Sequence, residues 1–173
     1  INFAPISFRD SILRCFRSRN LESIFSNIKN YIKDRNIDKF RKENLNLTAR
    51  YFSLNEVKEN TLAFDCLITG SDQVWNPYGI QSHGLVYFLP FGREGVKKIS
   101  YAASFGCIQY PIDVMTKIKP LLNEFSAISV REKTGLSILN DEGFYDLKIM
   151  PDPTLLLDEK DYVDLMAPSN SSN

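Results

Sequence analysis

From residue 62 onward, short apolar or β-branched segments alternate with segments of helical periodicity. The segments expected to be strands are residues 62–69, 97–103, 127–130 and 147–150. Helical periodicity is found at residues 111–125 and 133–140, and Asp158 is expected to cap a last helix. Because strands that alternate with helices indicate βαβ units, the sequence predicts an α/β protein: a Rossmann-like, mostly parallel sheet with flanking helices. An aromatic segment at residues 86–91 is open to interpretation as a further short strand.

The composition indicates three parts along the chain. Residues 1–50 hold eleven Lys or Arg and five Asp or Glu, and are expected to form a basic helical arm and a connection. Residues 51–166 are expected to form the Rossmann-like α/β domain, and residues 167–173 a disordered tail or a truncated interdomain linker. The basic charge favours a solvated helical face, with contact to an anionic ligand or to a membrane surface as the alternative.

Within the arm, the apolar residues of 21–34 recur at helical spacing, which predicts an amphipathic helix with Asn20 as its N-cap. Residues 53–56 have the form of a capping box and are expected to open a short helix. Between these two helices, three apolar residues are expected to anchor an extended connection: Phe40, Leu45 and Leu47.

Cysteine and histidine usage argues against several classes of site. Cys15, Cys66 and Cys107 form no CxxC pair, and His83 is the only histidine. This pattern favours reduced, packed thiols in a cytosolic protein and disfavours both a zinc site and a catalytic Cys/His pair. No metal is expected. The sequence also shows no secretory signal and no run of about 18 apolar residues, so the expected location is the cytoplasm, with the inner face of the membrane as an alternative.

Small and polar residues are placed where the expected strands end. The four motifs are TGSDQVWN at residues 69–76, SYAASFG at 100–106, ISVREKTG at 128–135 and PDPTLLL at 151–157. In open α/β sheets, ligands bind in the crevice outside the carboxyl ends of the strands. The first three motifs are therefore predicted to converge at one edge of the parallel sheet and to form one ligand site there.

The first motif supplies three candidate ligand contacts. Ser71 and the amides around it suit an anionic group, Asp72 suits a sugar hydroxyl, and Gln73 adds an amide. For Asp72, a turn in which its carboxylate caps backbone amides is an equal alternative. Trp75 is expected in the core, because large aromatic side chains usually pack there, with a flat face for a sugar ring as the alternative.

The other motifs supply three more candidates. Ser104 is the residue of the second motif expected to touch a ligand, although tight helix packing explains that motif equally well. Arg131 directly follows a strand at a helix start, which suits a phosphate or carboxylate. The alternative is an ion pair with one of three acids: Glu132, Asp72 or Asp152. Asp152, set between two prolines, either accepts from a sugar hydroxyl, pairs with Arg131 or shapes the loop.

Taken in order and spacing, the four motifs resemble those of the polysaccharide pyruvyl transferase family over roughly residues 35–165. The resemblance implies one domain of a GT-B-like enzyme with two Rossmann-like domains. It also implies transfer of the pyruvyl unit of phosphoenolpyruvate to a sugar of a surface polysaccharide or its precursor, forming a ketal. Arg131 corresponds to an arginine used in the family's donor site, whereas no general acid is identified, so the catalytic residues stay unassigned.

The resemblance also implies the partners. They are phosphoenolpyruvate as the donor, a sugar or lipid-linked saccharide as the acceptor, and the second domain of the same protein; no cofactor and no nucleic acid are expected. The family's first strand and Gly-containing loop are not found in this sequence, nor is its second domain, which indicates a fragment that is inactive alone. Two other functions stay open: half of a glycosyltransferase that uses a nucleotide-sugar, and a non-catalytic carbohydrate-binding domain.

Overall fold

The computed structural model describes residues 2–3, 37–51, 53–61, 63–79 and 84–165. The chain forms two compact units, residues 1–60 and residues 61–173. The predicted helix at residues 21–34, His83 and the tail at residues 167–173 lie outside the described residues.

In the described residues of the first unit, a two-stranded parallel sheet is followed by a short helix. Strand β1 (Asn2–Phe3) pairs with strand β2 (Arg50–Tyr51), and helix α3 (Leu54–Asn60) follows. The Ser53 hydroxyl accepts a hydrogen bond from the Glu56 amide at 3.2 Å, so the predicted helix start is confirmed. The α3 side chain that packs inward is Val57, which is fully buried.

The connection before β2 differs from the prediction. Residues 37–44 are helical, not extended, and the three predicted anchors are exposed: Phe40 (43%), Leu45 (50%) and Leu47 (37%). Charge pairs one helical turn apart favour the helix: Lys39 with Glu43 at 3.9 Å, and Arg41 with Asp38 at 3.9 Å. The sequence prediction was wrong here because it read three apolar residues as buried and overlooked these pairs.

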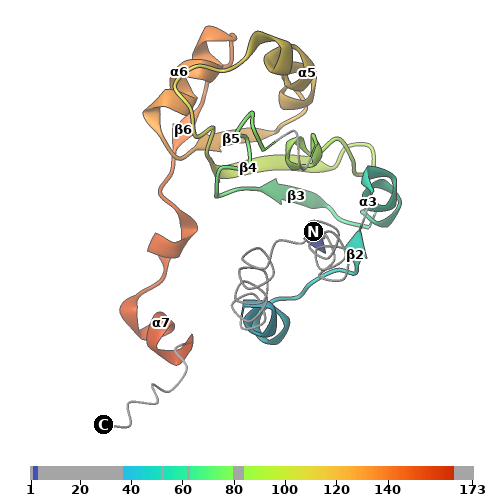
Figure 1. Ribbon diagram of the computed structural model, residues 1–173, viewed down its shortest axis with the longest axis vertical. Coiled ribbons are helices and arrows are strands. Elements are labelled where there is room, and N and C mark those ends of the chain that lie inside the picture. The colour runs from blue at the N-terminus through green and yellow to red at the C-terminus, as the bar shows by residue number, and fades with distance from the viewer. Residues whose placement is uncertain (1, 4–36, 52, 62, 80–83, 166–173) are drawn as a thin grey trace, which may run out of the picture. The chain divides into compact units, whose positions relative to one another are not determined.

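The second unit is built on a four-stranded parallel sheet (Figure 1). Its strands, in spatial as well as chain order, are β3 (Cys66–Thr69), β4 (Lys97–Ala103), β5 (Ala127–Val130) and β6 (Lys148–Ile149). Helix α5 (Ile112–Leu122) connects β4 to β5, and helix α6 (Lys133–Asp141) connects β5 to β6. The predicted α/β class with a parallel sheet and flanking helices is confirmed, and β3 forms an edge of the described sheet.

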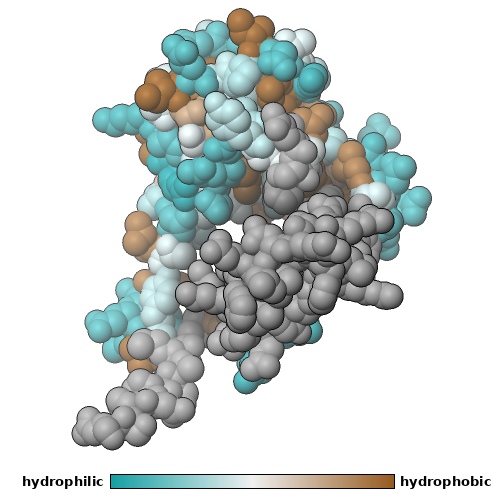
Figure 2. All heavy atoms as spheres, viewed as in Figure 1, coloured by the Kyte–Doolittle hydropathy of each residue, from teal (hydrophilic) through white to brown (hydrophobic). Residues whose placement is uncertain are grey.

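Both connecting helices cover the same face of the sheet. The strand order advances in one direction, and right-handed crossovers that advance in one direction place their helices on one side. The core confirms this arrangement, because Ala103 and Val130 from the strands pack with Ile118 of α5 and Leu139 of α6. Figure 2 shows one face of the second unit, on which apolar side chains are scattered among hydrophilic ones.

The aromatic segment after the first motif is a 3-10 helix, η1 (Val86–Phe88), and not a strand. Phe88 is fully buried and stacks on Trp75 with ring centroids 5.5 Å apart. A short apolar run that is buried in this way has the same sequence pattern as a buried strand, which explains the wrong interpretation. Trp75 also meets the rings of Phe105 and Phe125 edge-on, at 5.3 and 5.8 Å, and its indole N–H donates to the Tyr87 carbonyl.

A bulge interrupts the pairing of β4 with β5. Ser100 pairs with Ile128 and Ala103 with Val130, so two residues of β4 face one residue of β5. Two serines bridge the interruption: each hydroxyl, of Ser100 and of Ser129, donates to the other residue's carbonyl at 2.9 Å. The bulge residue Ala102 has φ 48° and its amide donates to the Ser129 hydroxyl at 3.0 Å. Side-chain hydrogen bonds therefore replace the missing ladder bonds just before β4 ends.

After β6 the chain continues as a 3-10 helix, η2 (Pro153–Leu156), and helix α7 (Glu159–Leu165). Asp158 immediately precedes α7, as predicted, and its amide donates to the Asp161 carboxylate at 3.0 Å. Among the helices in the described part of the chain, none combines the length and the apolar character needed to cross a membrane.

Candidate functional site

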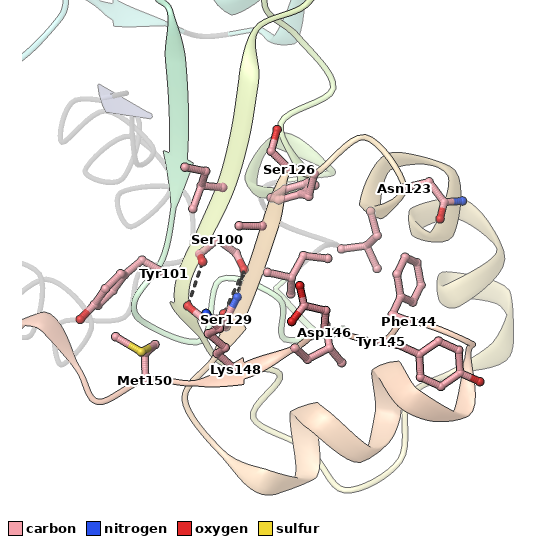
Figure 3. A pocket seen from close by; sticks show the side chains of 16 residues that line it. Ser100, Tyr101, Asn123, Ser126, Ser129, Phe144, Tyr145, Asp146, Lys148 and Met150 are labelled. Atoms are coloured by element: carbon pink, nitrogen blue, oxygen red, sulfur yellow. Dashed lines mark hydrogen bonds between the residues drawn. The ribbon is translucent and has the colours of Figure 1, made fainter.

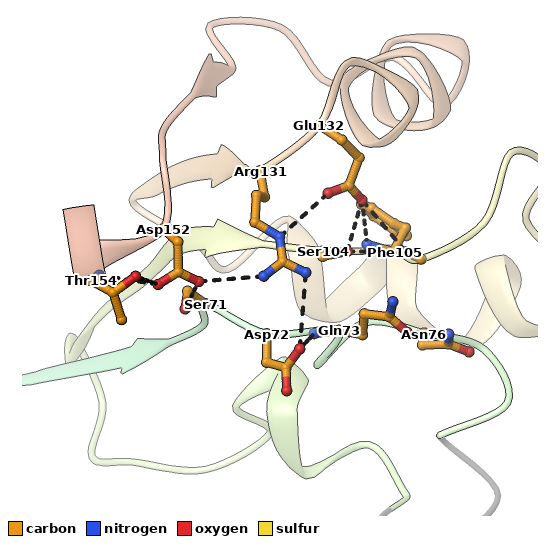
Figure 4. A network of polar contacts seen from close by, with 11 residues as sticks. Ser71, Asp72, Gln73, Asn76, Ser104, Phe105, Arg131, Glu132, Asp152 and Thr154 are labelled. Carbon is orange, nitrogen blue, oxygen red and sulfur yellow. Dashed lines mark hydrogen bonds and ion pairs between the residues drawn. The ribbon is translucent and has the colours of Figure 1, made fainter.

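The loops that follow β3, β4, β5 and β6 meet at the carboxyl end of the sheet (Figure 4). The guanidinium of Arg131, after β5, lies 3.9 Å from the Asp72 carboxylate after β3 and 3.3 Å from the Asp152 carboxylate after β6. The Ser104 amide, after β4, donates to the Asp72 carbonyl at 3.1 Å. The predicted convergence of the motifs is therefore confirmed.

Two glycines allow these loops to approach each other closely. At Gly70, with φ 130°, an added Cβ would lie 1.9 Å from the Tyr101 carbonyl oxygen of β4. At Gly106, with φ 61°, it would lie 2.8 Å from the side-chain amides of Gln73 and Asn76. Only glycine combines such a φ with such a contact, so these positions serve contacts between the motifs.

Arg131 sits among three carboxylates, and all three ion pairs considered from the sequence are present. Besides Asp152 and Asp72, the Glu132 carboxylate lies 4.0 Å from the Arg131 Nε. Strong charge-assisted hydrogen bonds of this type measure about 2.7–2.9 Å, so each of these contacts is long. The Arg131 side chain is 31% exposed. The guanidinium is thus held near its partners without a close bidentate pair, and part of it faces solvent.

Asp152 is held much more closely. Its Oδ1 accepts from the Thr154 amide at 3.0 Å and from the Thr154 hydroxyl at 2.8 Å. Its Oδ2 accepts from the Ser71 hydroxyl at 2.7 Å and from Arg131. The Thr154 amide, then Ser71 and the Thr154 hydroxyl, lower the Asp152 pKa to about 2, and Arg131 contributes least. Asp152 is therefore ionised at neutral pH and stays satisfied even when Arg131 turns away.

Asp72 and Gln73 are the most accessible candidates. The Asp72 side chain is 91% exposed, and its Oδ1 accepts from the Gln73 amide at 2.7 Å. The Gln73 side-chain oxygen accepts from the Asn76 amide at 3.1 Å, which orients both amide groups. These carboxylate and amide groups can accept from and donate to hydroxyl groups of a ligand.

Ser104 is buried, with 2% of its surface exposed, and its hydroxyl donates to Glu132 Oε1 at 3.0 Å. That Ser104 also contacts a ligand stays a prediction. The same Glu132 oxygen accepts from the Phe105 amide at 2.9 Å. Sequence reasoning considered Glu132 only as an ion-pair partner of Arg131 and missed this second role, because no sequence pattern shows that its carboxylate reaches the loop after β4.

Other candidates fall outside the cluster. Trp75 is fully buried, so its predicted place in the core is confirmed and it presents no face to a sugar ring. Burial, and then the nearby Glu132 carboxylate, raise the pKa of the Cys107 thiol, which opposes formation of a thiolate. In the described part of the chain, no group of three or more His, Cys, Asp or Glu residues is placed to hold a metal ion.

A separate notch of about 410 Å³ lies between β5 and the segment before β6 (Figure 3). It exists because β6 pairs only with the last two residues of β5, Ser129 and Val130, so the chain diverges from β5 before that point. Asp146 points into the notch, and the hydrogen-bonded Ser100 and Ser129 line it. None of the six candidate site residues lines the notch.

The charges around Arg131 limit what the cluster can bind by itself. One guanidinium faces three carboxylates, from Asp72, Glu132 and Asp152, so the immediate surroundings carry a negative excess. Such a cluster suits the hydroxyl groups of a neutral sugar. A ligand with several negative charges needs further cationic groups besides Arg131.

Comparison with known proteins gives one match. A model of the polysaccharide pyruvyl transferase family matches residues 7–173. Neither the curated proteins nor the solved structures contain a match.

Proposed function

The chain belongs to the polysaccharide pyruvyl transferase family, and we propose that it takes part in the transfer of the pyruvyl group of phosphoenolpyruvate to a sugar. In this proposal the acceptor is a surface polysaccharide or its precursor, a free or lipid-linked saccharide, and the product is a ketal. Membership of a transferase family supports the class of reaction, while the donor and the acceptor are part of the proposal.

The proposed reaction forms two C–O bonds and breaks one. Two hydroxyl groups of one sugar bond to C2 of phosphoenolpyruvate, C3 of the enol takes up a proton and becomes a methyl group, and the bond from C2 to the phosphate oxygen breaks. The two hydroxyl protons go to C3 and to the departing phosphate. Such a reaction needs cationic groups at the donor's phosphate and carboxylate, acceptors that orient the sugar hydroxyls, and a general acid near C3.

The observation that carries the proposal is the position of Arg131 and the length of its ion pairs. Its guanidinium lies where the four motifs meet, and its ion pairs measure 3.3, 3.9 and 4.0 Å. Asp152 depends on Arg131 least among its hydrogen-bond donors, so the guanidinium can turn to a ligand without leaving that carboxylate unsatisfied. In the proposed function Arg131 binds the phosphate or carboxylate of the donor.

The remaining candidates have supporting roles in the proposal. Asp72 and Gln73 contact hydroxyls of the acceptor, since they are the accessible acceptor and amide beside Arg131. Ser71 donates its hydroxyl to the Asp152 carboxylate at 2.7 Å, and this pair lies next to the guanidinium. We do not propose Asp152 as the general acid, because its pKa of about 2 leaves that carboxyl without a proton at neutral pH.

The charge excess around Arg131 indicates that the donor site needs cations from elsewhere in the protein. A second Rossmann-like domain, as in GT-B-like enzymes, is the proposed source of these groups and of the general acid. We further propose that the enzyme acts in the cytoplasm, at the inner face of the membrane where the acceptor is lipid-linked, and that it uses no cofactor besides its donor.

The proposal is tested with the full-length protein, phosphoenolpyruvate and a panel of saccharide acceptors. The expected result is release of inorganic phosphate together with a ketal-linked pyruvyl group on the acceptor, detected by NMR and mass spectrometry. Transfer from a nucleotide-sugar, with phosphoenolpyruvate inert, would support a glycosyltransferase instead. Saccharide binding with no turnover of either donor would support a non-catalytic carbohydrate-binding protein.

A further inference from the structure

We propose that Glu132 is a positioning residue of this site: its carboxylate holds Arg131 and the turn at residues 104–106 in one fixed relation, without touching the substrate. The inference rests on the proposed function, in which Arg131 binds the donor. It concerns how the site is kept in order, which the family membership leaves open.

The first observation is that one oxygen of Glu132 accepts several hydrogen bonds from a single turn. Oε1 accepts from the Ser104 hydroxyl at 3.0 Å, from the Phe105 amide at 2.9 Å and, at the longer distance of 3.4 Å, from the Gly106 amide. Figure 4 shows these bonds meeting at the end of the Glu132 side chain. A carboxylate that accepts several N–H and O–H bonds fixes the conformation of the turn that supplies them.

The second observation is that Glu132 does not serve its own helix. It occupies the N-cap position of α6, where short polar side chains such as Asp or Ser accept from amides of the first helical turn, and its longer side chain makes no such bond. Its backbone has the extended conformation usual at this position, with φ −127° and ψ 155°, but the side chain bonds to the loop after β4. The capping position is thus used for a contact between two motifs.

The third observation is that the other oxygen faces the arginine. Glu132 Oε2 lies 4.0 Å from the Arg131 Nε, while the guanidinium nitrogens Nη1 and Nη2 face Asp152 and Asp72. A negative charge on the Nε side attracts the guanidinium from a third direction and so restrains the rotation of the arginine side chain.

The turn held by Glu132 carries the restraint further, to the first motif. The Ser104 amide donates to the Asp72 carbonyl at 3.1 Å, and the Ser104 carbonyl accepts from the Trp75 amide at 3.1 Å. Fixing Ser104 therefore fixes the backbone that presents Asp72 to solvent. Through this chain of bonds, one carboxylate sets the relative positions of the arginine and of the loop opposite it.

The test uses the full-length protein and two variants, Glu132→Ala and Glu132→Gln. Glu142→Gln is the matched control, because Glu142 is 34% exposed against 30% for Glu132 and pairs with Lys119 at 2.8 Å, outside the candidate site. Two quantities are measured: hydrogen exchange of the Phe105 and Gly106 amides, and kcat/KM for phosphoenolpyruvate. Exchange needs no substrate, so it reports on the carboxylate's hold on the turn even where no transfer is found.

In Glu132→Ala, the Phe105 amide is expected to exchange about 10–100-fold faster, which corresponds to loss of a hydrogen bond to a charged group. The Gly106 amide is expected to change less, because it also donates to the Ser104 hydroxyl at 3.2 Å. In Glu132→Gln, the side-chain oxygen still accepts, so exchange is expected to change much less. For kcat/KM, Glu132→Ala is expected to lose about 100-fold through misplacement of the site, and Glu132→Gln less. Glu142→Gln is expected to change neither quantity.

A double-mutant cycle with Arg131→Lys shows whether Glu132 acts through the arginine. If it does, the losses of Glu132→Ala and Arg131→Lys are not additive, and the double variant loses less than the product of the two factors. Additive losses of kcat/KM in the cycle would overturn the positioning role in favour of a direct role for the carboxylate. The same conclusion would follow if Glu132→Ala and Glu132→Gln lost kcat/KM equally while amide exchange in Glu132→Gln stayed unchanged. A wild-type protein that transfers no pyruvyl group refutes the proposed function instead, and unchanged exchange in Glu132→Ala refutes the hold on the turn.

Discussion

The same two loops contribute to two regions of opposite character. Trp75 and Phe105 project into an aromatic cluster in the core, where each is fully buried. Asp72, in the same loop as Trp75, is 91% exposed beside Arg131, and Ser104, next to Phe105, bonds to Glu132. One region is held by ring packing with no charge present, and the other by carboxylates around a single arginine.

The difference shows how a polar site is kept in place at the end of a sheet. The aromatic cluster fixes the two loops on their core side, because Trp75 packs against the rings of Phe88, Phe105 and Phe125 at centroid distances of 5.3–5.8 Å. The polar cluster is then free to be only loosely paired, as its 3.9 and 4.0 Å contacts show. Stability is expected to depend on the first region, and ligand binding on the second.

The largest expected effect comes from breaking the aromatic cluster. Trp75→Ala removes the ring that stacks on Phe88 and meets Phe105, and is expected to lower the free energy of unfolding by about 3–5 kcal/mol. Chemical denaturation of the variant and of wild type measures this. The control is Tyr78→Ala, because Tyr78 lies in the same loop but is 78% exposed, and its loss should stay within about 0.5 kcal/mol. Equal effects at the two positions would contradict the assigned role of Trp75.

The next effect falls on the polar cluster alone. Arg131→Lys keeps the charge but loses the planar fork of the guanidinium. The transition-state stabilisation measured by kcat/KM for the donor is expected to fall by about 1.5–3 kcal/mol, with little change in melting temperature. Steady-state kinetics and a melting curve on one preparation separate binding from stability. Arg93→Lys is the control, since Arg93 pairs with Asp65 outside the site. A lowered melting temperature with normal donor kinetics would assign Arg131 to the fold and not to a ligand.

A smaller effect tests the contact between the loops. Gly106→Ala places a methyl group on a backbone with φ 61°, 2.8 Å from the Gln73 and Asn76 side-chain amides. The left-handed backbone is expected to lower the free energy of unfolding by about 1–2 kcal/mol, and the crowding of the two amides is expected to lower it further. Gly95→Ala is the matched control, because Gly95 has φ 74° but no atom within 4 Å of the added Cβ. The difference between the two losses measures the crowding alone. Equal losses would show that the Gln73 and Asn76 side chains simply move aside.

The smallest effect is a dependence on pH. The Asp152 pKa is lowered from 3.8 to about 2, so its contribution to stability is fully present above pH 4 and is lost as the pH falls through about 2. Asp152→Asn is therefore expected to be less stable than wild type at neutral pH, and the gap should narrow between pH 4 and pH 2. Denaturation curves over this range measure the gap, and Asp141→Asn, an exposed carboxyl of α6, corrects for the change in net charge. A gap that stays constant with pH would contradict the lowered pKa.

Much of the framework could be predicted from local patterns. β4 and β5 have the predicted bounds, and the positions of Asp72 and Arg131 after strands were enough to predict that they meet. The bulge could not be predicted, because its sign within β4 is the burial of two successive residues, Ala102 and Ala103, and two successive apolar residues are also typical of a fully buried strand. The direction of the Glu132 side chain also depends on tertiary structure, since its partners, the Ser104 hydroxyl and the Phe105 amide, lie in the loop after another strand.

The hydrogen bond from Ser71 to Asp152 joins residues 81 positions apart, and the strand that carries Asp152 into place pairs through only two residues. Closing so long a loop costs chain entropy, and so few ladder bonds give the segment after β6 little local stability of its own. On warming, this segment is the part of the second unit expected to detach first, at a temperature where the aromatic cluster is still folded. The arginine then loses its closest carboxylate while the sheet persists, so heat removes the geometry of the site before it removes the fold.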